Sequence, residues 1–185
     1  MRSIAECLAR TAQHAYTRRE EMTNTTENIL PLENASVRAA ELRAAGKKLV
    51  TINGSFDVLH AGHLTILEEA KAQGDILFVG MNSDASVRQY KGPHRPIIAQ
   101  EHRARMLAAL VCVDYVTLID APEAAAVIIE AIRPHVHVNG SEYGSPEQWV
   151  EYPVLQRYGV TGYACKRRPG LATSDIITKI QHLAA

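Results

Sequence analysis

Short apolar runs alternate with helical patterns along most of this chain, and this alternation constrains the fold more than any other feature. Strands are predicted at residues 48–52, 76–80, 115–119, 136–138 and 162–165. The strands are rich in Val, Ile and Leu and lack clean period-two alternation, which is typical of burial on both faces. Strands separated by helices form a parallel sheet through right-handed crossovers. The sequence therefore predicts an α/β fold, a Rossmann-like doubly wound parallel sheet.

Helical patterns occupy the intervals between these strands. Residues 35–45 are rich in helix formers, and Gly46 follows where a C-terminal cap is expected. Further helices are predicted at 63–73, 101–111, 123–132, 146–158 and 174–184. Pro153 makes the helix at 146–158 the least regular of them, because proline removes a backbone donor. Ligands of such a sheet bind beyond the carboxyl ends of its strands, where the strand order switches.

Length and composition predict a single domain. With 185 residues, 46% of them hydrophobic, the chain can bury one substantial core. Residues 1–30 differ from the rest, with several arginines followed by a polar run, and are expected to form a poorly ordered N-terminal extension. The domain itself is predicted to span residues 31–185.

Charge and cysteine content limit the partners. The 20 basic and 20 acidic residues cancel, so no net field draws the chain to nucleic acid or to an anionic membrane. No apolar run approaches the roughly 18 residues of a membrane span. The three cysteines are widely spaced and match neither a zinc site nor a disulfide framework. We therefore expect a cytoplasmic protein that binds neither nucleic acid nor membranes.

The segment between Thr51 and Leu64 joins the first strand to the next helix and has the sequence TINGSFDVLHAGHL. A strand, a glycine-containing loop and a helix N-terminus form a phosphate site, because unpaired backbone N–H groups and the positive end of the helix dipole converge there. His60 and His63 are three residues apart, so their rings are expected on the same side of the first helical turn, toward the anion. Gly62 allows the backbone to approach a ligand closely.

The motif His60-Ala61-Gly62-His63, preceded by Asn53-Gly54-Ser55-Phe56-Asp57, resembles the signature of the HIGH-type nucleotidyltransferase superfamily. Within that superfamily, the chain is most similar to the adenylyltransferases of ADP-heptose synthesis, which act on D-glycero-beta-D-manno-heptose 1-phosphate. The similarity runs from about residue 29 to the C-terminus. It includes NSD at 82–84, KG at 91–92, RP at 95–96, EHR at 101–103, VD at 113–114 and TSDII at 173–177.

The resemblance implies transfer of AMP from ATP without a covalent enzyme intermediate. The acceptor phosphate would attack the α-phosphorus of Mg²⁺-bound ATP in line and release pyrophosphate. An ionised sugar phosphate needs no strong general base, so catalysis would depend on position and electrostatics. His60, His63 and Lys91 would be the catalytic residues, the histidines as donors to the α-phosphate and Lys91 as a counter-charge. Mg²⁺ would be held mainly by the triphosphate rather than by protein ligands.

The resemblance also implies which residues bind the two substrates. Residues 170–174 match a loop that holds the β- and γ-phosphates, and Arg103 resembles an arginine that fixes the triphosphate or the adenosine. The expected nucleotide-binding residues are Asn53, Gly54, Ser55, Phe56, Gly62, Asn82, Arg103, Gly170, Thr173 and Ser174. The expected acceptor-binding residues are Asp57, Asn139 and Gly140. Relatives are commonly dimers, so a homo-oligomer is expected.

Two positions depart from the family pattern. Ala172 stands where the phosphate loop usually carries a hydroxyl, which changes the expected contacts to the phosphates. Asn139 stands where the heptose enzymes often carry a lysine, so the acceptor pocket is expected to differ.

Simpler interpretations compete with several of these assignments. An isolated HxxH pair is more often structural, and zinc would need additional ligands at suitable spacing. Asp57 can cap backbone N–H groups of a tight turn instead of meeting a substrate. His135 and His137 alternate on a strand and are expected to be packing or surface residues. Trp149 and Tyr143 either line an acceptor pocket or pack in the core.

Two other functions remain open from the sequence. One is a cytidylyltransferase acting on glycerol 3-phosphate or an alcohol-amine phosphate. Asn53 and Ala61 favour the heptose group instead, because those cytidylyltransferases tend to carry aromatic residues at both positions. The other is a catalytically silent nucleotide-binding module, which the two departures permit and the intact catalytic residues disfavour.

Overall fold

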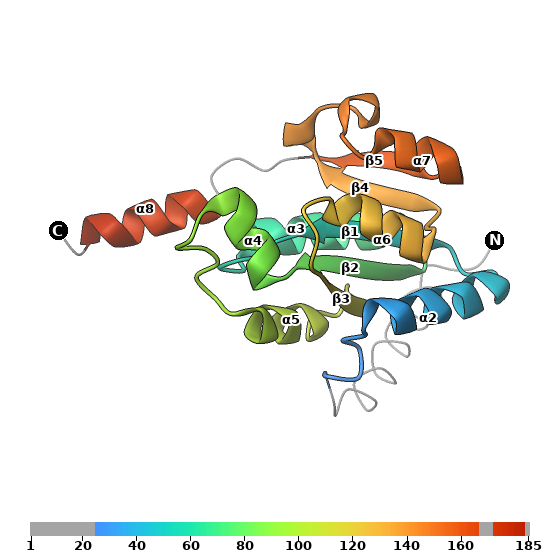
Figure 1. The fold of residues 1–185 in the computed structure, drawn as a ribbon, viewed down its shortest axis with the longest axis horizontal. Coiled ribbons are helices and arrows are strands. Elements are labelled where there is room, and N and C mark those ends of the chain that lie inside the picture. The colour runs from blue at the N-terminus through green and yellow to red at the C-terminus, as the bar shows by residue number, and fades with distance from the viewer. Residues whose placement is uncertain (1–24, 167–171, 184–185) are drawn as a thin grey trace, which may run out of the picture.

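The computed structural model describes residues 25–166 and 172–183 of the chain. A five-stranded sheet lies at its centre, in the order β3-β2-β1-β4-β5 (Figure 1). The strands are β1 (Leu49–Gly54), β2 (Ile76–Asn82), β3 (Tyr115–Ile119), β4 (Val136–Gly140) and β5 (Thr161–Cys165). All neighbouring strands are parallel. The predicted Rossmann-like α/β fold is confirmed.

Helices cover both faces of the sheet. They are α2 (Leu32–Ala44), α3 (Ala61–Lys71), α4 (Asp84–Lys91), α5 (Gln100–Ala108), α6 (Ala124–Ile132), α7 (Tyr152–Tyr158) and α8 (Thr173–Leu183), with two 3₁₀ turns at Ser141–Tyr143 and Pro146–Gln148. Helices α3 and α5 pack on one face, and α2 and α6 pack on the other. None of these helices, taken over the described residues, is long and apolar enough to cross a membrane.

The middle strand β2 shows why the apolar runs lack alternation. Leu77 and Val79 belong to the core cluster under α3 and α5, whereas Phe78 belongs to the cluster under α2 and α6. All three side chains are fully buried. A strand with a helix layer on each face needs apolar residues at odd and even positions alike, as the sequence predicted.

One helix was not predicted from the sequence. Helix α4 is mostly polar, and only Ser86 and Val87 are buried in it. Its first turn is capped by Ser83, whose hydroxyl accepts from the Ser86 N–H at 3.0 Å. The segment predicted as one helix at 146–158 is divided into a 3₁₀ turn and α7. Pro153 lies in the first turn of α7, where a backbone N–H makes no hydrogen bond within the helix, so its absence in proline breaks none.

Residues just before the predicted domain boundary at 31 also pair with the sheet. The Leu30 N–H donates to the Val116 carbonyl at 2.8 Å, and the Val116 N–H donates to the Asn28 carbonyl at 2.9 Å. Ile29 thereby forms a parallel bridge with the edge strand β3. Residues 1–24 of the predicted extension lie outside the described residues.

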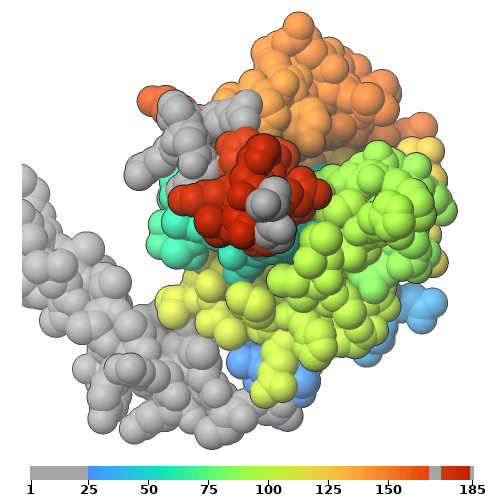
Figure 2. Space-filling model, turned by 90° about the vertical axis from the view of Figure 1, so that its left-hand side faces the viewer, coloured from blue at the N-terminus to red at the C-terminus, as the bar shows by residue number. Residues whose placement is uncertain are grey.

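Helix α8 stands apart from the sheet, beyond α3 and α4 (Figure 1). Figure 2 looks onto this end of the molecule, with α8 (red) in front of the other segments. None of its residues is buried, and Ile180 and Leu183 are exposed. The Thr173 hydroxyl donates to the Asp57 carbonyl at 3.0 Å. This hydrogen bond joins the start of α8 to the loop that follows β1.

Candidate active site

The loop between β1 and α3 turns sharply and forms the centre of the site. Phe56 and Val58 have φ values of 46° and 51°, the left-handed region that side chains rarely adopt. Gly54 makes room for this turn, because a Cβ there would lie 3.2 Å from the Phe56 ring. The chain thereby reaches the N-terminus of α3 close to the end of β1.

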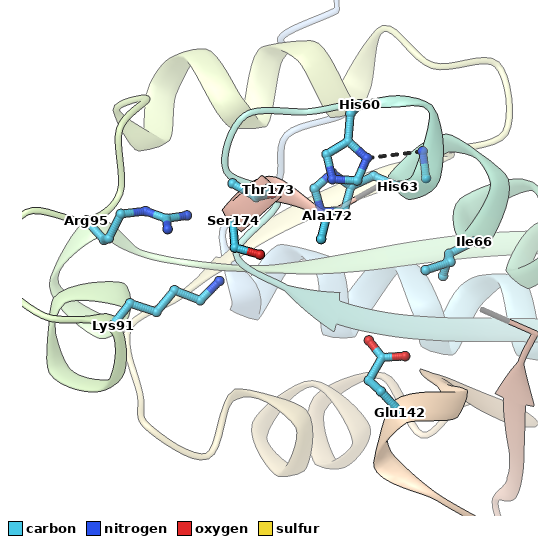
Figure 3. A pocket seen from close by; sticks show the side chains of 10 residues that line it. His60, His63, Ile66, Lys91, Arg95, Glu142, Ala172, Thr173 and Ser174 are labelled. Atoms are coloured by element: carbon cyan, nitrogen blue, oxygen red, sulfur yellow. Dashed lines mark hydrogen bonds between the residues drawn. The ribbon is translucent and has the colours of Figure 1, made fainter. Parts of the chain in front are cut away.

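His60 and His63 lie side by side at the N-terminus of α3 (Figure 3). Their rings are stacked, with centroids 3.9 Å apart and planes inclined by 24°. His60 is the N-cap, and its Nδ1 accepts from the Gly62 N–H at 3.1 Å. Because Nδ1 is the acceptor, the proton of the neutral His60 ring is on Nε2. The prediction that both rings share one side of the first turn is confirmed.

Both imidazoles are neutral near pH 7. Burial lowers the pKa of His60. Burial, followed by the neighbouring charges of His60 and Lys91, lowers the pKa of His63 to about 4. A neutral imidazole still offers one N–H donor. The pair can therefore stabilise negative charge on a phosphate without transferring a proton.

The low pKa of His63 predicts how the stability of the ligand-free protein depends on pH. In the unfolded chain this pKa is near 6.5, so between pH 6.5 and 4 the unfolded state binds more protons than the folded one. We expect the free energy of unfolding to fall as pH falls through this range, by at most ~1.4 kcal/mol per pH unit from this residue. Urea unfolding of the wild type and of His63→Gln measures the effect, and the variant should show the shallower slope. Equal slopes would contradict a buried neutral ring.

Lys91 and Arg95 supply the positive charge of the site (Figure 3). The Lys91 Nζ donates to the Ser55 hydroxyl at 2.9 Å. The Arg95 guanidinium pairs with the Asp57 carboxylate at 2.7 Å. Burial and the nearby Arg95 charge lower the pKa of Lys91. A bound polyanion relieves this repulsion, so the two cations suit a site for phosphates.

Asp57 lies beneath this cationic side and is 1% exposed. Its carboxylate accepts from the backbone N–H groups of Ile97 and Ile98 at 2.9 and 3.0 Å, in addition to Arg95. Burial raises the pKa of Asp57, but these donors outweigh it and hold the pKa below its ordinary value. Asp57 therefore holds the loop that carries Arg95, which is the capping role that the sequence left open.

A cavity of about 460 Å³ opens between these groups. It is lined by His60, Gly62, His63, Ile66, Lys91, Arg95, Glu142, Ala172, Thr173 and Ser174. All three predicted catalytic residues are among them. Gly170, which was expected to contact the phosphates, lies outside the described residues. Ile66, Arg95 and Glu142 were not predicted from the sequence, although the RP pair at 95–96 was part of the resemblance.

Some predicted nucleotide-binding residues lie away from this cavity. The Phe56 ring is buried and packs edge-on against His63, with centroids 5.6 Å apart. Asn82 is buried, and its side-chain amide donates to the Ser86 hydroxyl at 2.9 Å. Asn53 lines a second cavity instead. These residues shape the walls of the site or extend it.

Arg103 is buried beneath the site, with a side chain that is 1% exposed. Its Nε donates to the Ile98 carbonyl at 2.8 Å. Its guanidinium also donates to the carbonyls of Ser55 and Asn82 and pairs with Asp84 at 2.6 Å. Arg103 thus joins the ends of β1 and β2 to the loop that follows α4. In this structure it holds the site together and does not line the cavity.

The second cavity, of about 200 Å³, lies at the ends of β1 and β4. Asn53 and Asn139 line it, and the Asn139 side-chain amide donates to Glu151 at 2.7 Å. Gly140 ends β4, and the Glu142 carboxylate lies close against it. A Cβ at Gly140 would be only 2.2 Å from that carboxylate, so no larger residue fits there without a shift. Of the predicted acceptor residues of β4, Asn139 lines this second cavity, and Gly140 lies against Glu142, which lines the first.

The described residues offer neither a metal centre nor a reactive thiol. Within 25–166 and 172–183, no group of three or more His, Cys, Asp or Glu side chains could hold a metal ion. Cys112 and Cys165 are free. Burial raises the pKa of both thiols, to about 12 at Cys165, so they stay protonated near pH 7.

Comparison with known proteins agrees with this geometry. A family model described as cytidylyltransferase-like matches residues 51–179. Among curated proteins, the Bifunctional protein HldE of Geobacter metallireducens is 45% identical over 138 residues, and that of Wolinella succinogenes is 45% identical over 155 residues. These alignments cover 75% and 84% of this chain but 28% and 31% of the relatives. The chain thus spans less than a third of the length of either relative.

Two solved structures share the fold. The lipopolysaccharide core biosynthesis protein from Thermoplasma volcanium is 27% identical, with a TM-score of 0.55 over 66% of this chain and 98% of that one. The pantoate-beta-alanine ligase from Francisella tularensis is 13% identical, with a TM-score of 0.54 over 85% and 78% of the two chains, and shows the fold alone. The family match covers more than half of this chain and includes His60, His63 and Lys91. The chain therefore belongs to the cytidylyltransferase-like family of HIGH-type nucleotidyltransferases.

Proposed function

We propose that this protein transfers AMP from ATP to D-glycero-beta-D-manno-heptose 1-phosphate, giving ADP-heptose and pyrophosphate. The observation that carries the proposal is the pair of stacked neutral imidazoles facing one cavity together with Lys91. Heptose as the acceptor rests on the resemblance seen in the sequence. The similarity to a lipopolysaccharide core biosynthesis protein supports the same class of substrate.

The larger cavity suits a triphosphate. Lys91 and Arg95 provide two positive charges on one side, and the N-terminus of α3 provides the positive end of its helix dipole on another. Thr173 and Ser174, at the start of α8, line the same space, and the Ser174 hydroxyl can donate to the β- and γ-phosphates. The Thr173 hydroxyl already donates to the Asp57 carbonyl. The α-phosphate would then lie in front of the two histidines.

The proposed step is an in-line substitution at the α-phosphorus. An oxygen of the acceptor phosphate forms the new P–O bond while the bond to the bridging oxygen of pyrophosphate breaks. The attacking oxygen is already ionised, so no proton has to be removed. His60 and His63 each donate one N–H to the non-bridging oxygens as their charge grows, and Lys91 offsets the charge of the phosphates.

Mg²⁺ would enter with ATP and neutralise part of the charge on the departing pyrophosphate. The described residues that line the cavity include a single carboxylate, Glu142, among several cationic and hydroxyl groups. Such a lining suits a metal ion held by triphosphate oxygens better than one held in a protein cage. We further propose a homodimer that works in the cytoplasm, on the family resemblance and the widely spaced cysteines. Sedimentation of the purified chain would test the dimer.

Pyrophosphate release with ATP or CTP, measured against heptose 1-phosphate, glycerol 3-phosphate and phosphocholine, tests the proposed reaction. We expect ATP with heptose 1-phosphate to exceed every other pair by at least about tenfold in kcat/KM. Mass spectrometry should identify ADP-heptose as the product. Activity with CTP and an alcohol phosphate, but none with ATP and heptose 1-phosphate, would overturn the proposal. Nucleotide binding with no pyrophosphate release from any pair would indicate a silent module.

A further inference from the structure

Asp57 lies in the middle of a strained turn. The residues on either side of it, Phe56 and Val58, both have φ in the left-handed region, at 46° and 51°. Neither is glycine, so the turn costs free energy and persists only where contacts around it hold it in place. Asp57 makes such contacts in two directions, through its carboxylate and through its backbone carbonyl.

The carboxylate of Asp57 holds the loop of residues 92–99, which joins α4 to α5. One carboxylate oxygen accepts from the Arg95 Nε at 2.8 Å, and the other accepts from the Ile98 N–H at 3.0 Å. The Ile97 N–H lies 3.1 and 2.9 Å from the two oxygens. The loop carries Arg95, and Lys91 ends α4 immediately before it. Asp57 therefore fixes the segment that brings both cations to the larger cavity.

The backbone carbonyl of Asp57 holds the start of α8. It accepts from the Thr173 hydroxyl at 3.0 Å, although the two residues are 116 positions apart in the sequence. None of the residues of α8 is buried, so packing contributes little to the position of this helix. A threonine hydroxyl has one proton to donate, and in this bond it is not available to a phosphate. The bond instead places Ser174, the next residue, at the wall of the cavity (Figure 3).

The two contacts of Asp57 depend on each other through the strained turn. Its carboxylate and its carbonyl belong to one residue, and both point correctly only while the flanking residues stay in the left-handed region. Loss of either contact lets the turn relax, which weakens the other contact. Such a coupling is reciprocal, because the same free energy acts in both directions.

We propose that Asp57 is a positioning residue that couples the two phosphate-binding segments, and that Thr173 is its partner and not a phosphate ligand. Arg95 and Ser174 then reach a bound triphosphate as one unit, although they come from distant parts of the chain. This inference rests on the proposed function for the nature of the ligand, a nucleoside triphosphate. It adds a role for two residues that line or support the cavity without meeting the reacting atoms.

Amide hydrogen exchange of the ligand-free full chain, followed by NMR, tests the coupling without any catalysis. Thr173→Val removes the hydroxyl donor and leaves every contact of the Asp57 carboxylate in place. We expect it to speed exchange of the Ile97 and Ile98 amides, which donate to that carboxylate, about fivefold. Thr173→Ser keeps the donor and should exchange like the wild type.

The reciprocal experiment starts from the other contact. Asp57→Asn removes the charge that pairs with Arg95 but keeps the backbone carbonyl that Thr173 uses. We expect exchange to speed up in the first turn of α8, where the Ile176 N–H donates to the Ala172 carbonyl. Arg95→Met leaves Asp57 itself intact and should act in the same direction, so the test does not depend on the folding of one variant.

Calorimetric binding of inorganic triphosphate with Mg²⁺ measures the consequence for the ligand, because this probe has no adenosine. Thr173→Val should raise its dissociation constant about fivefold, the loss of one hydrogen bond. Thr173→Ser should stay within about twofold of the wild type, since serine offers the same donor. Thr65→Val is the matched control: the Thr65 hydroxyl also donates to a backbone carbonyl, that of Ala61, but within α3. That variant should bind triphosphate like the wild type.

Three outcomes would count against the proposals. Weaker triphosphate binding by Thr173→Val with unchanged exchange at residues 97 and 98 would make Thr173 a direct phosphate ligand and overturn the coupling. Equal losses for the valine and serine variants would overturn it as well, because the hydroxyl would then not matter. A wild-type chain that binds neither triphosphate nor ATP would refute the proposed function, while the exchange rates of the ligand-free chain would still decide whether Asp57 couples the two segments.

Discussion

His63→Ala should lower the turnover of AMP transfer roughly 10²- to 10³-fold while leaving the protein folded. The imidazole N–H is expected to donate to the α-phosphate as negative charge builds there, and alanine removes that donor. The His63 ring also packs against His60 and Phe56, and those contacts are lost with it. Its buried Nδ1 has no hydrogen-bond partner among the described residues, so no protein hydrogen bond is broken at that atom. His60 remains as the N-cap of α3 in this variant, with its bond to the Gly62 N–H.

Single-turnover transfer at saturating ATP, together with thermal unfolding, separates the two effects. His102→Ala is a matched control, because His102 is exposed on α5 and does not line the cavity. We expect that control to keep both activity and stability. A His63→Ala protein that retains more than a tenth of wild-type turnover would contradict the assigned role. A His60→Ala protein should lose activity and also about 0.5–2 kcal/mol of stability, because it removes the helix cap.

The sequence was sufficient to predict the sheet because the signal for buried parallel strands is local. Residues 115–119 became β3 with the predicted bounds. Helix α4 was not predicted, because residues 84–91 are mostly polar and show no apolar periodicity. The helix depends instead on the Ser83 cap and on the buried Val87. The bridge of Ile29 to β3 joins residues far apart in sequence, so no local pattern could indicate it.

The same distinction between local and distant order applies to the site. The placement of the His60 and His63 rings on one side of the helix was predictable, since a spacing of three at a helix start brings both rings to that side. The role of Asn53 depended on strand order. Ile52 is paired with Val138 in the parallel register of β1 and β4, which brings the next residue of each strand, Asn53 and Asn139, to the same end of the sheet. Only the fold shows that Asn53 and Asn139 line a second cavity together.

Arg103→Met should destabilise the protein by about 3–5 kcal/mol, even without any ligand. The substitution leaves Asp84 without its buried partner and removes the guanidinium donors of three backbone carbonyls, those of Ser55, Asn82 and Ile98. Substitution of an arginine whose main role was to bind ATP would have a different effect. Its loss would weaken ATP binding while the stability of the ligand-free chain stayed near that of the wild type.

Urea or thermal unfolding of the ligand-free protein decides between these roles. At roughly 2–4 °C per kcal/mol for a chain of this size, the expected loss lowers Tm by about 6–20 °C. Arg105→Met is the matched control, because Arg105 is exposed two residues further along α5, and its Tm should differ little from that of the wild type. An unchanged Tm for Arg103→Met with weakened ATP binding would assign Arg103 to the nucleotide. A large loss of Tm would indicate that Arg103 holds the ends of β1 and β2 together with the loop that follows α4. The catalytic geometry would then depend on a residue that never meets the substrate.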